Sequence, residues 1–140
     1  MSDEKRMYEA QRWLDTAIND YDAAVILKEH KKFSLSCFHA QQAAEKSIKA
    51  LGYLLGNDPC GHSISKLLHE LIEKQTKLKK TLSLLGVGAM RLDQFYIPTR
   101  YPDGIPDISP EKAYGVEDAK SGIKYAKMFL TAVKKIFEGY

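Results

Sequence analysis

A chain of 140 residues is long enough to bury a hydrophobic core, and we expect residues 1–140 to form a single domain. With 44% hydrophobic and 28% charged residues, its composition is close to the globular average, which excludes a disordered or low-complexity chain. The net charge of +3 is a mild excess, far from the dense basic stripe of a dedicated nucleic-acid-binding protein.

The first predicted element is a long amphipathic helix at about residues 4–30. Ser2 or Asp3 can cap its start. Apolar residues recur in it at alternating spacings of three and four, which places them on one helical face, and Asp20 falls on the opposite, polar side. The apolar stripe consists of Met7, Ala10, Leu14, Ala17, Tyr21 and Ala24.

A second helix is predicted from about residue 34 to Leu55. It ends at Gly56 and Asn57, because both residues accept the left-handed conformation that follows many helices. Four alanines make this helix thin, so neighbouring elements can pack closely against it. We therefore expect it to be central in the fold or to lie at a subunit interface. The alanines are Ala40, Ala43, Ala44 and Ala50.

Two further helices are predicted in the middle of the chain. Residues 57–61 form a loop, after which Ser63 caps a short third helix. A fourth helix spans about residues 78–92. Gly86 and Gly88 lie inside its apolar pattern, and each glycine costs up to about 1 kcal/mol in a helix interior, so we expect a kink or a break there.

Residues 95–109 are the one long irregular segment, because their prolines prevent a continuous helix. Ser109 followed by Pro110 has the pattern of a helix cap with proline at the first helical position, so the last helix is expected to begin there and to reach about Phe137. The chain is thus predicted to be all-α: an antiparallel up-and-down bundle of four long helices plus one short helix.

Hydropathy and cysteine usage predict the location of the protein. The N-terminus is polar and charged, without the pattern of a signal peptide, and no apolar run approaches the roughly 20 residues that span a bilayer. We therefore expect a cytoplasmic protein with no membrane association. Cys37 and Cys60 form neither a metal motif nor a disulfide framework, and Cys37 on an apolar stripe is expected to be a buried free thiol.

Four blocks of sequence resemble the HEPN family, the higher-eukaryote and prokaryote nucleotide-binding domain. FSLSCFHAQQAAEKSIKALGYLLG at residues 33–56 is similar to the family's second helix, where a run like AQQAAEK is the most recognisable feature. GHSISKLLHEL at 61–71 resembles its loop histidine and following helix, and YIPTRYPD at 96–103 resembles the stretch after its fourth helix. AYGVEDAKSGIKYAKMFLTAVKKIF at 113–137 resembles its last helix, so the resemblance covers nearly the whole chain.

The resemblance implies a small stand-alone prokaryotic member of that family, which would form a homodimeric helical bundle. Such proteins often work beside a small nucleotidyltransferase, commonly as a toxin–antitoxin pair. Many members are ribonucleases that use an arginine followed four to six residues later by a histidine. This chain departs from that pattern, because none of its arginines is followed by a histidine at that spacing. The resemblance therefore does not predict ribonuclease activity here.

Arg100 and its neighbours Tyr101 and Asp103 are the first candidates for a nucleotide- or phosphate-binding site. In a proline-stiffened loop, Arg100 could clamp a phosphate with two parallel hydrogen bonds, and Tyr101 could stack on a base. The alternative is structural: Arg100 and Asp103 could pair with each other and fix the loop to the bundle.

Two further groups complete the candidate site. His62 could bind a phosphate together with the free N–H groups at the start of the third helix, or could simply be a neighbour of the helix cap. His39, Gln42 and Lys46 share one helical face, where they could line a groove for a nucleotide, form a solvated surface, or belong to a dimer interface. Arg100 and His62 are the only catalytic candidates.

We expect neither a metal site nor a cofactor, because the chain has no set of ligands at the usual spacings. The leading hypothesis is a dimeric module that binds a nucleotide or RNA and acts with a partner nucleotidyltransferase. One alternative is a divergent, metal-independent endoribonuclease. Another is a bundle with a purely structural or protein-interaction role.

Overall fold

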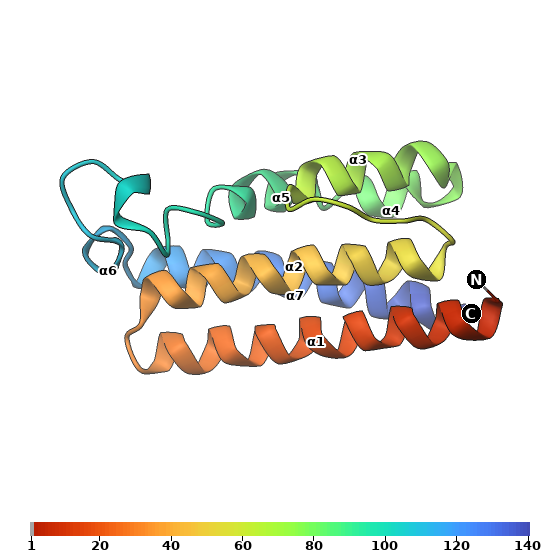
Figure 1. Ribbon diagram of the computed structural model, residues 1–140, viewed down its shortest axis with the longest axis horizontal. Coiled ribbons are helices and arrows are strands. Elements are labelled where there is room, and N and C mark those ends of the chain that lie inside the picture. The colour runs from red at the N-terminus through yellow and green to blue at the C-terminus, as the bar shows by residue number, and fades with distance from the viewer. Residues whose placement is uncertain (1) are drawn as a thin grey trace.

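Three long helices, α1 (Asp3–Glu29), α2 (Phe33–Leu54) and α7 (Val116–Glu138), lie side by side along the longest axis of the molecule (Figure 1). The computed structural model describes residues 2–140, and every regular element among these residues is a helix, which confirms the all-α class. The shorter elements are α3 (Ile64–Lys74), the 3-10 helix η1 (Thr76–Leu78), α4 (Lys79–Ser83), α5 (Gly86–Asp93), the 3-10 helix η2 (Pro102–Gly104) and α6 (Pro110–Ala113).

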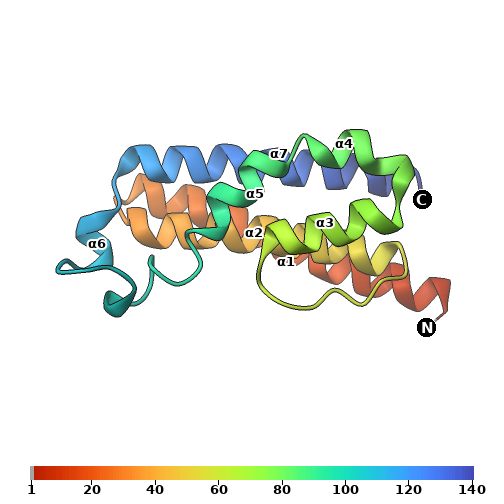
Figure 2. The same cartoon turned by 90° about the horizontal axis from the view of Figure 1, so that it is seen from above.

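The helices alternate in direction, as expected for an up-and-down bundle. The chain turns back after α1, so that α2 runs antiparallel to it, and α4 and α5 together run antiparallel to α7 (Figures 1 and 2). The one short helix that was predicted beside the four long ones is α3, which packs on both α5 and α2. The predicted antiparallel bundle is therefore confirmed.

Local signals set the ends of the first two helices. The side chain of Ser2 accepts a hydrogen bond from the backbone N–H of Lys5 at 3.2 Å, which caps α1 as predicted. A short turn then reverses the chain, with Lys31 in the left-handed conformation at φ 61°. After α2, Gly56 has φ 83°, a value that favours glycine at the end of a helix.

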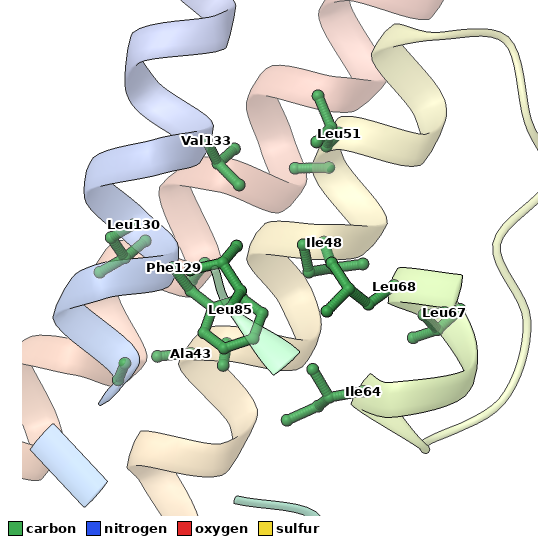
Figure 3. Close-up of a cluster of buried hydrophobic side chains, with 14 of the residues drawn as sticks. Ala43, Ile48, Leu51, Ile64, Leu67, Leu68, Leu85, Phe129, Leu130 and Val133 are labelled. Atoms are coloured by element: carbon green, nitrogen blue, oxygen red, sulfur yellow. The ribbon is translucent and has the colours of Figure 1, made fainter. Parts of the chain in front are cut away.

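Helix α2 is the centre of the core, as its alanines predict. Ala40, Ala43 and Ala44 have no exposed surface, and α2 packs against α1, α7 and α3. The largest fully buried side chain is Phe129 of α7, which lies beside Leu85 and close to Ala43 (Figure 3). A small residue on α2 therefore makes room for a large one on α7.

Helix α3 has two caps at its N-terminus. The side chain of Ser63 accepts a hydrogen bond from the N–H of Lys66 at 3.2 Å, as predicted. The carboxylate of Asp93, the last residue of α5, accepts from the N–H of Ile64 at 2.6 Å and from the N–H of Ser65 at 3.0 Å. Since the first N–H groups of a helix have no partner within the helix, Asp93 satisfies two that would otherwise be unpaired.

The fourth predicted helix is broken, and the break lies close to the expected glycines. Helix α4 ends at Ser83 and α5 begins at Gly86. Gly88 lies where α5 crosses α7, and a Cβ atom there would be only 2.9 Å from a ring carbon of Tyr125. Gly88 thus permits a close approach of the two helices, which a larger residue would prevent.

The last helix differs from the prediction at its start. Ser109 and Pro110 do begin a helix, but α6 ends at Ala113, and α7 begins only after Gly115. The backbone N–H of Gly115 donates to Asp118 Oδ2 at 2.8 Å, which fixes this second start. Among residues 2–140, no helix is long and apolar enough to cross a membrane.

Candidate functional site

Arg100 lies half-buried against a group of aromatic rings. Its guanidinium carbon is 4.2 Å from the ring centre of Phe38, 4.8 Å from that of Tyr96 and 5.0 Å from that of Tyr101. Its Nε–H donates to the backbone carbonyl of Tyr96 at 2.9 Å. A cation over an aromatic face is attracted by the electrons of the ring, and three such contacts fix the plane of the guanidinium.

The alternative pairing of Arg100 with Asp103 does not occur. Within the part of the chain that the structure describes, no carboxylate is paired with Arg100, and Asp103 is exposed in η2. The terminal nitrogens of Arg100 therefore keep their hydrogen-bonding capacity for an anion.

His62 joins the same group of rings from the loop before α3. Its ring is stacked on Tyr96, with 4.7 Å between the ring centres and 18° between the planes. Its side chain is 59% exposed, and its Nδ1 lies 3.4 Å from Glu45 Oε2. The structure thus brings together the two catalytic candidates, Arg100 and His62, around one tyrosine. We call the set of Phe38, His62, Tyr96, Arg100 and Tyr101 the arginine–aromatic cluster.

Glu45 is a buried carboxylate on α2 behind this cluster. Its side chain is only 3% exposed, and it accepts hydrogen bonds from Lys49 Nζ at 3.2 Å and from Gln41 Nε2 at 3.1 Å. Burial of an unpaired carboxylate would cost several kcal/mol, so these partners are needed to keep Glu45 inside the fold. Held in this way, Glu45 also orients the imidazole of His62.

Two residues of the predicted face of His39, Gln42 and Lys46 hold a second buried carboxylate, Asp20 of α1. His39 Nδ1 lies 3.0 Å from Asp20 Oδ1, and Lys46 Nζ donates to Asp20 Oδ2 at 2.7 Å. Burial alone would raise the pKa of Asp20, but the hydrogen bonds from His39 and Lys46 outweigh burial, and the pKa lies below its ordinary value of 3.8. Gln42 instead donates to Gln41 Oε1 at 2.8 Å.

The start of α3 is not available to a phosphate. The carboxylate of Asp93 occupies the N–H groups of Ile64 and Ser65, so these groups cannot assist His62 in binding an anion, which was one of its two interpretations. His62 therefore faces the aromatic rings and Glu45 rather than an open helix terminus.

Several important residues of this region escaped the sequence analysis. Tyr96 was noted only as part of the block at residues 96–103 that resembles the HEPN family, although its ring contacts both Arg100 and His62. Asp20 was expected on the polar side of the first helix, but it is only 7% exposed. Phe38 lies off the apolar stripe of α2, a position that indicates a second packing surface, and its ring lies against the guanidinium of Arg100.

Metal ligands do not gather anywhere in the described chain. Within residues 2–140, no group of three or more histidine, cysteine, aspartate or glutamate side chains could hold a metal ion. Cys37 is buried, as expected, and burial raises the pKa of its thiol to about 12. The side chains of the arginine–aromatic cluster are one arginine, one histidine and three aromatic rings.

The helical order, the histidine loop before α3 and the arginine loop after α5 together define a bundle of the HEPN type. The HEPN domain family matches residues 10–136, and this chain belongs to that family.

Solved structures and a sequence relative agree with this assignment. TT1696 from Thermus thermophilus is 32% identical, with a TM-score of 0.80 over 90% of this chain and 96% of that one. ST0689, an archaeal HEPN homologue, is also 32% identical, with a TM-score of 0.73 over 90% and 95% of the two chains. A protein of Methanocaldococcus jannaschii that is named as a candidate toxin, MJ1304, is 26% identical over 131 residues, or 89% of this chain and 86% of that protein.

Proposed function

We propose that this HEPN-family protein binds a nucleotide or RNA through the arginine–aromatic cluster. The observation that carries the proposal is the state of Arg100: its guanidinium is held over three aromatic rings by one backbone hydrogen bond and has no carboxylate partner among residues 2–140. An oriented cation without a counter-charge suits a phosphate, which can accept two parallel hydrogen bonds from it. The exposed rings of His62 and Tyr101 offer stacking surfaces for a base.

Thermal unfolding with and without ligand tests this proposal. We expect AMP, ATP, GTP or short RNA to raise the melting temperature of the wild type, because a ligand at 100 times its dissociation constant adds about 2.7 kcal/mol to stability. Arg100→Ala should lose the shift. Arg100→Lys should lose most of it, because lysine keeps the charge but not the planar fork.

Arg91→Ala is the matched control for this experiment. Arg91 is an exposed arginine on α5, outside the cluster, so its removal changes the net charge by the same amount. If Arg91→Ala and Arg100→Ala reduce the ligand-induced shift equally, the effect is one of total charge and the cluster is not the binding site.

A second candidate function, metal-independent RNA cleavage, is favoured by the contact between His62 and Glu45. In such a reaction His62 would take the proton from a ribose 2′-hydroxyl as its oxygen attacks the adjacent phosphorus. Arg100 would stabilise the negative charge on the phosphate, and as the P–O5′ bond breaks, the 5′-oxygen of the next nucleotide would leave with a proton taken from the solvent. The family's arginine–histidine spacing is absent, so the histidine would come from the loop before α3.

Cleavage assays decide between binding and catalysis. RNA cleavage that persists in EDTA and is lost in both His62→Ala and Arg100→Ala would establish the enzyme. Cleavage that is unchanged in both variants would come from a contaminating nuclease. Binding without cleavage would support the binding function and contradict the catalytic one.

We also propose two protein partners. One is a second copy of this chain, and the other is a small nucleotidyltransferase with which the chain would form a toxin–antitoxin pair. The M. jannaschii relative is named as a candidate toxin, which supports a partner that acts as an antitoxin. Exposed apolar residues near the start of α5 support self-association: Leu84, in the break before α5, and Val87 and Met90 of α5 are 73%, 62% and 66% exposed. Light scattering after gel filtration should give twice the monomer mass in the wild type and the monomer mass in Val87→Glu.

The nucleotidyltransferase is tested by co-purification with the tagged chain. A stable complex would support the toxin–antitoxin arrangement. A monomer that binds neither nucleotides, RNA nor the enzyme would favour the purely structural role.

A further inference from the structure

Two groups of exposed apolar side chains follow each other along the chain. The first, which we call the α5 patch, consists of Leu84, Val87 and Met90. The second, the loop patch, consists of Ile97 and Ile108 in the segment between α5 and α6, and both of its residues are exposed. Single exposed apolar residues are normal on a protein surface, whereas groups of them mark surfaces that another molecule covers.

The α5 patch lies in a basic part of the chain. Leu84 and Val87 follow Lys80 at spacings of four and three, and the backbone at Leu84 and Leu85 is close to helical, so the three side chains lie on one face. Every charged residue from position 74 to position 92 is basic, and all of these residues are exposed. They are Lys74, Lys77, Lys79, Lys80 and Arg91.

The loop patch lies in an acidic part of the chain. The only charged residues from position 101 to position 109 are Asp103 and Asp107, and both are exposed. The two patches therefore match in apolar character and are opposite in charge. Within one copy both patches are exposed, so their complementary chemistry is not used inside the bundle.

The loop that carries the second patch has a defined shape. A Cβ atom on Gly104 would be 3.0 Å from Pro98 Cα and 3.6 Å from Ile97 Cγ2, so two parts of the loop pack directly on each other. The buried hydroxyl of Thr99 donates to the backbone carbonyl of Phe95, which ties the loop to the end of α5. A surface that is already ordered loses little conformational entropy when it binds.

The charges decide which surface of a second copy suits the α5 patch. Two α5 patches facing each other would bring Lys80 and its basic neighbours together, and like charges at a contact disfavour it. The loop patch instead offers apolar side chains beside two aspartates. The chain runs from α4 through α5 into this loop along one side of the long helices (Figures 1 and 2). A two-fold axis can therefore pair each patch with its complement in a closed dimer.

We propose that two copies of this chain associate by a crossed contact, in which the α5 patch of each copy binds the loop patch of the other. This inference rests on the self-association in the proposed function and names the surface that covers the α5 patch. The apolar residues form the centre of each contact, and the lysines of η1 and α4 and the aspartates of the loop form its rim.

Mixing two variants tests the crossed contact. Val87→Glu places a charge in the α5 patch, and Ile108→Glu places one in the loop patch. Each variant alone damages both contacts of the dimer, so we expect each to raise the dissociation constant about tenfold or more. In an equal mixture the intact loop patch of one variant can bind the intact α5 patch of the other. The mixture should therefore associate roughly threefold or more tightly than either variant alone.

Light scattering after gel filtration and sedimentation measure the association. Ile26→Glu is the matched control, because it makes the same change at an exposed apolar residue of α1 outside both patches, and it should dimerise as the wild type does. The AMP-induced shift in melting temperature is recorded for all variants. It should persist, because neither Val87 nor Ile108 belongs to the arginine–aromatic cluster.

The outcomes separate this inference from the proposed function. Two monomeric variants that form a dimer when mixed support the crossed contact. A dimeric Ile108→Glu, or a mixture that stays monomeric, overturns the crossed contact and leaves self-association through α5 in place. A monomeric wild type overturns both, and if Val87→Glu then prevents co-purification of the nucleotidyltransferase, that enzyme covers the α5 patch. The AMP shift tests nucleotide binding independently of all these results.

Discussion

Removal of the Asp93 carboxylate should destabilise the junction between α5 and α3. Its two oxygens accept hydrogen bonds from Ile64 N–H and Ser65 N–H, and Ser63 Oγ also donates to it at 3.2 Å. Loss of a helix cap costs about 0.5–2 kcal/mol, and a negative charge at a helix N-terminus contributes about 0.3–1 kcal/mol. We therefore expect Asp93→Ala to lower the free energy of unfolding by about 2 kcal/mol and Asp93→Asn by about half of that.

Two measurements check this expectation. For a chain of this size the loss should lower the melting temperature by roughly 4–8 °C in calorimetry. Hydrogen exchange is more specific, because amides at the start of a helix are normally unprotected. The amides of Ile64 and Ser65 should be protected in the wild type and exchange rapidly in Asp93→Ala.

Asp22→Ala serves as the control, since it removes an exposed carboxylate from α1 that caps no other helix. A loss in Asp93→Ala of less than about 0.5 kcal/mol, no larger than in this control, would refute the role of Asp93 as a cap between helices.

Three further predictions follow from the packing and the buried ionisable groups. Gly88→Ala should destabilise the fold by about 1–3 kcal/mol, because its Cβ would be 2.9 Å from the tyrosine ring of α7. Gly86→Ala has open space around it and should be neutral or stabilising by up to about 1 kcal/mol. Urea unfolding measures the free energy of unfolding of both variants. The stability that Asp20 contributes is fully present above pH 3.8, its ordinary pKa, and is lost as the pH falls through the lower pKa of the folded state. Unfolding between pH 2 and 6 should thus depend less on pH in Asp20→Asn, and an unchanged slope would contradict this. Cys60, which is exposed, should react with Ellman's reagent in the native protein, while buried Cys37 should react only after unfolding.

The long helices could be predicted because their own sequence determines them. The apolar stripe of α1 and the cap at Ser2 lie within one segment, so periodicity and capping place it without knowledge of the rest of the fold. The same holds for the thin, alanine-rich α2. The break before α7 could not be read in this way, since it depends on how the loop after α5 returns to the bundle.

The candidate site was predictable in its residues but not in their partners. Arg100 and His62 were selected by type and by position in loops, yet nothing in the sequence showed that one tyrosine would contact both. Asp20 is buried only because His39 and Lys46, which lie on the next helix, reach its two oxygens. Such pairings depend on the register between helices, which hydrophobic periodicity does not determine.

The small side chains of α2 also matter during synthesis of the chain. The hairpin of α1 and α2 is complete early, but the surface of α2 that receives Phe129 stays uncovered until all of the chain from Leu55 to α7 has been made. At roughly 5–20 residues per second this interval lasts several seconds, during which exposed apolar surface can attract other chains. Because that surface is built from residues such as Ala40 and Ala43, it exposes far less apolar area than leucines would. The thin helix that allows close packing in the finished bundle therefore also keeps the unfinished chain less prone to aggregation.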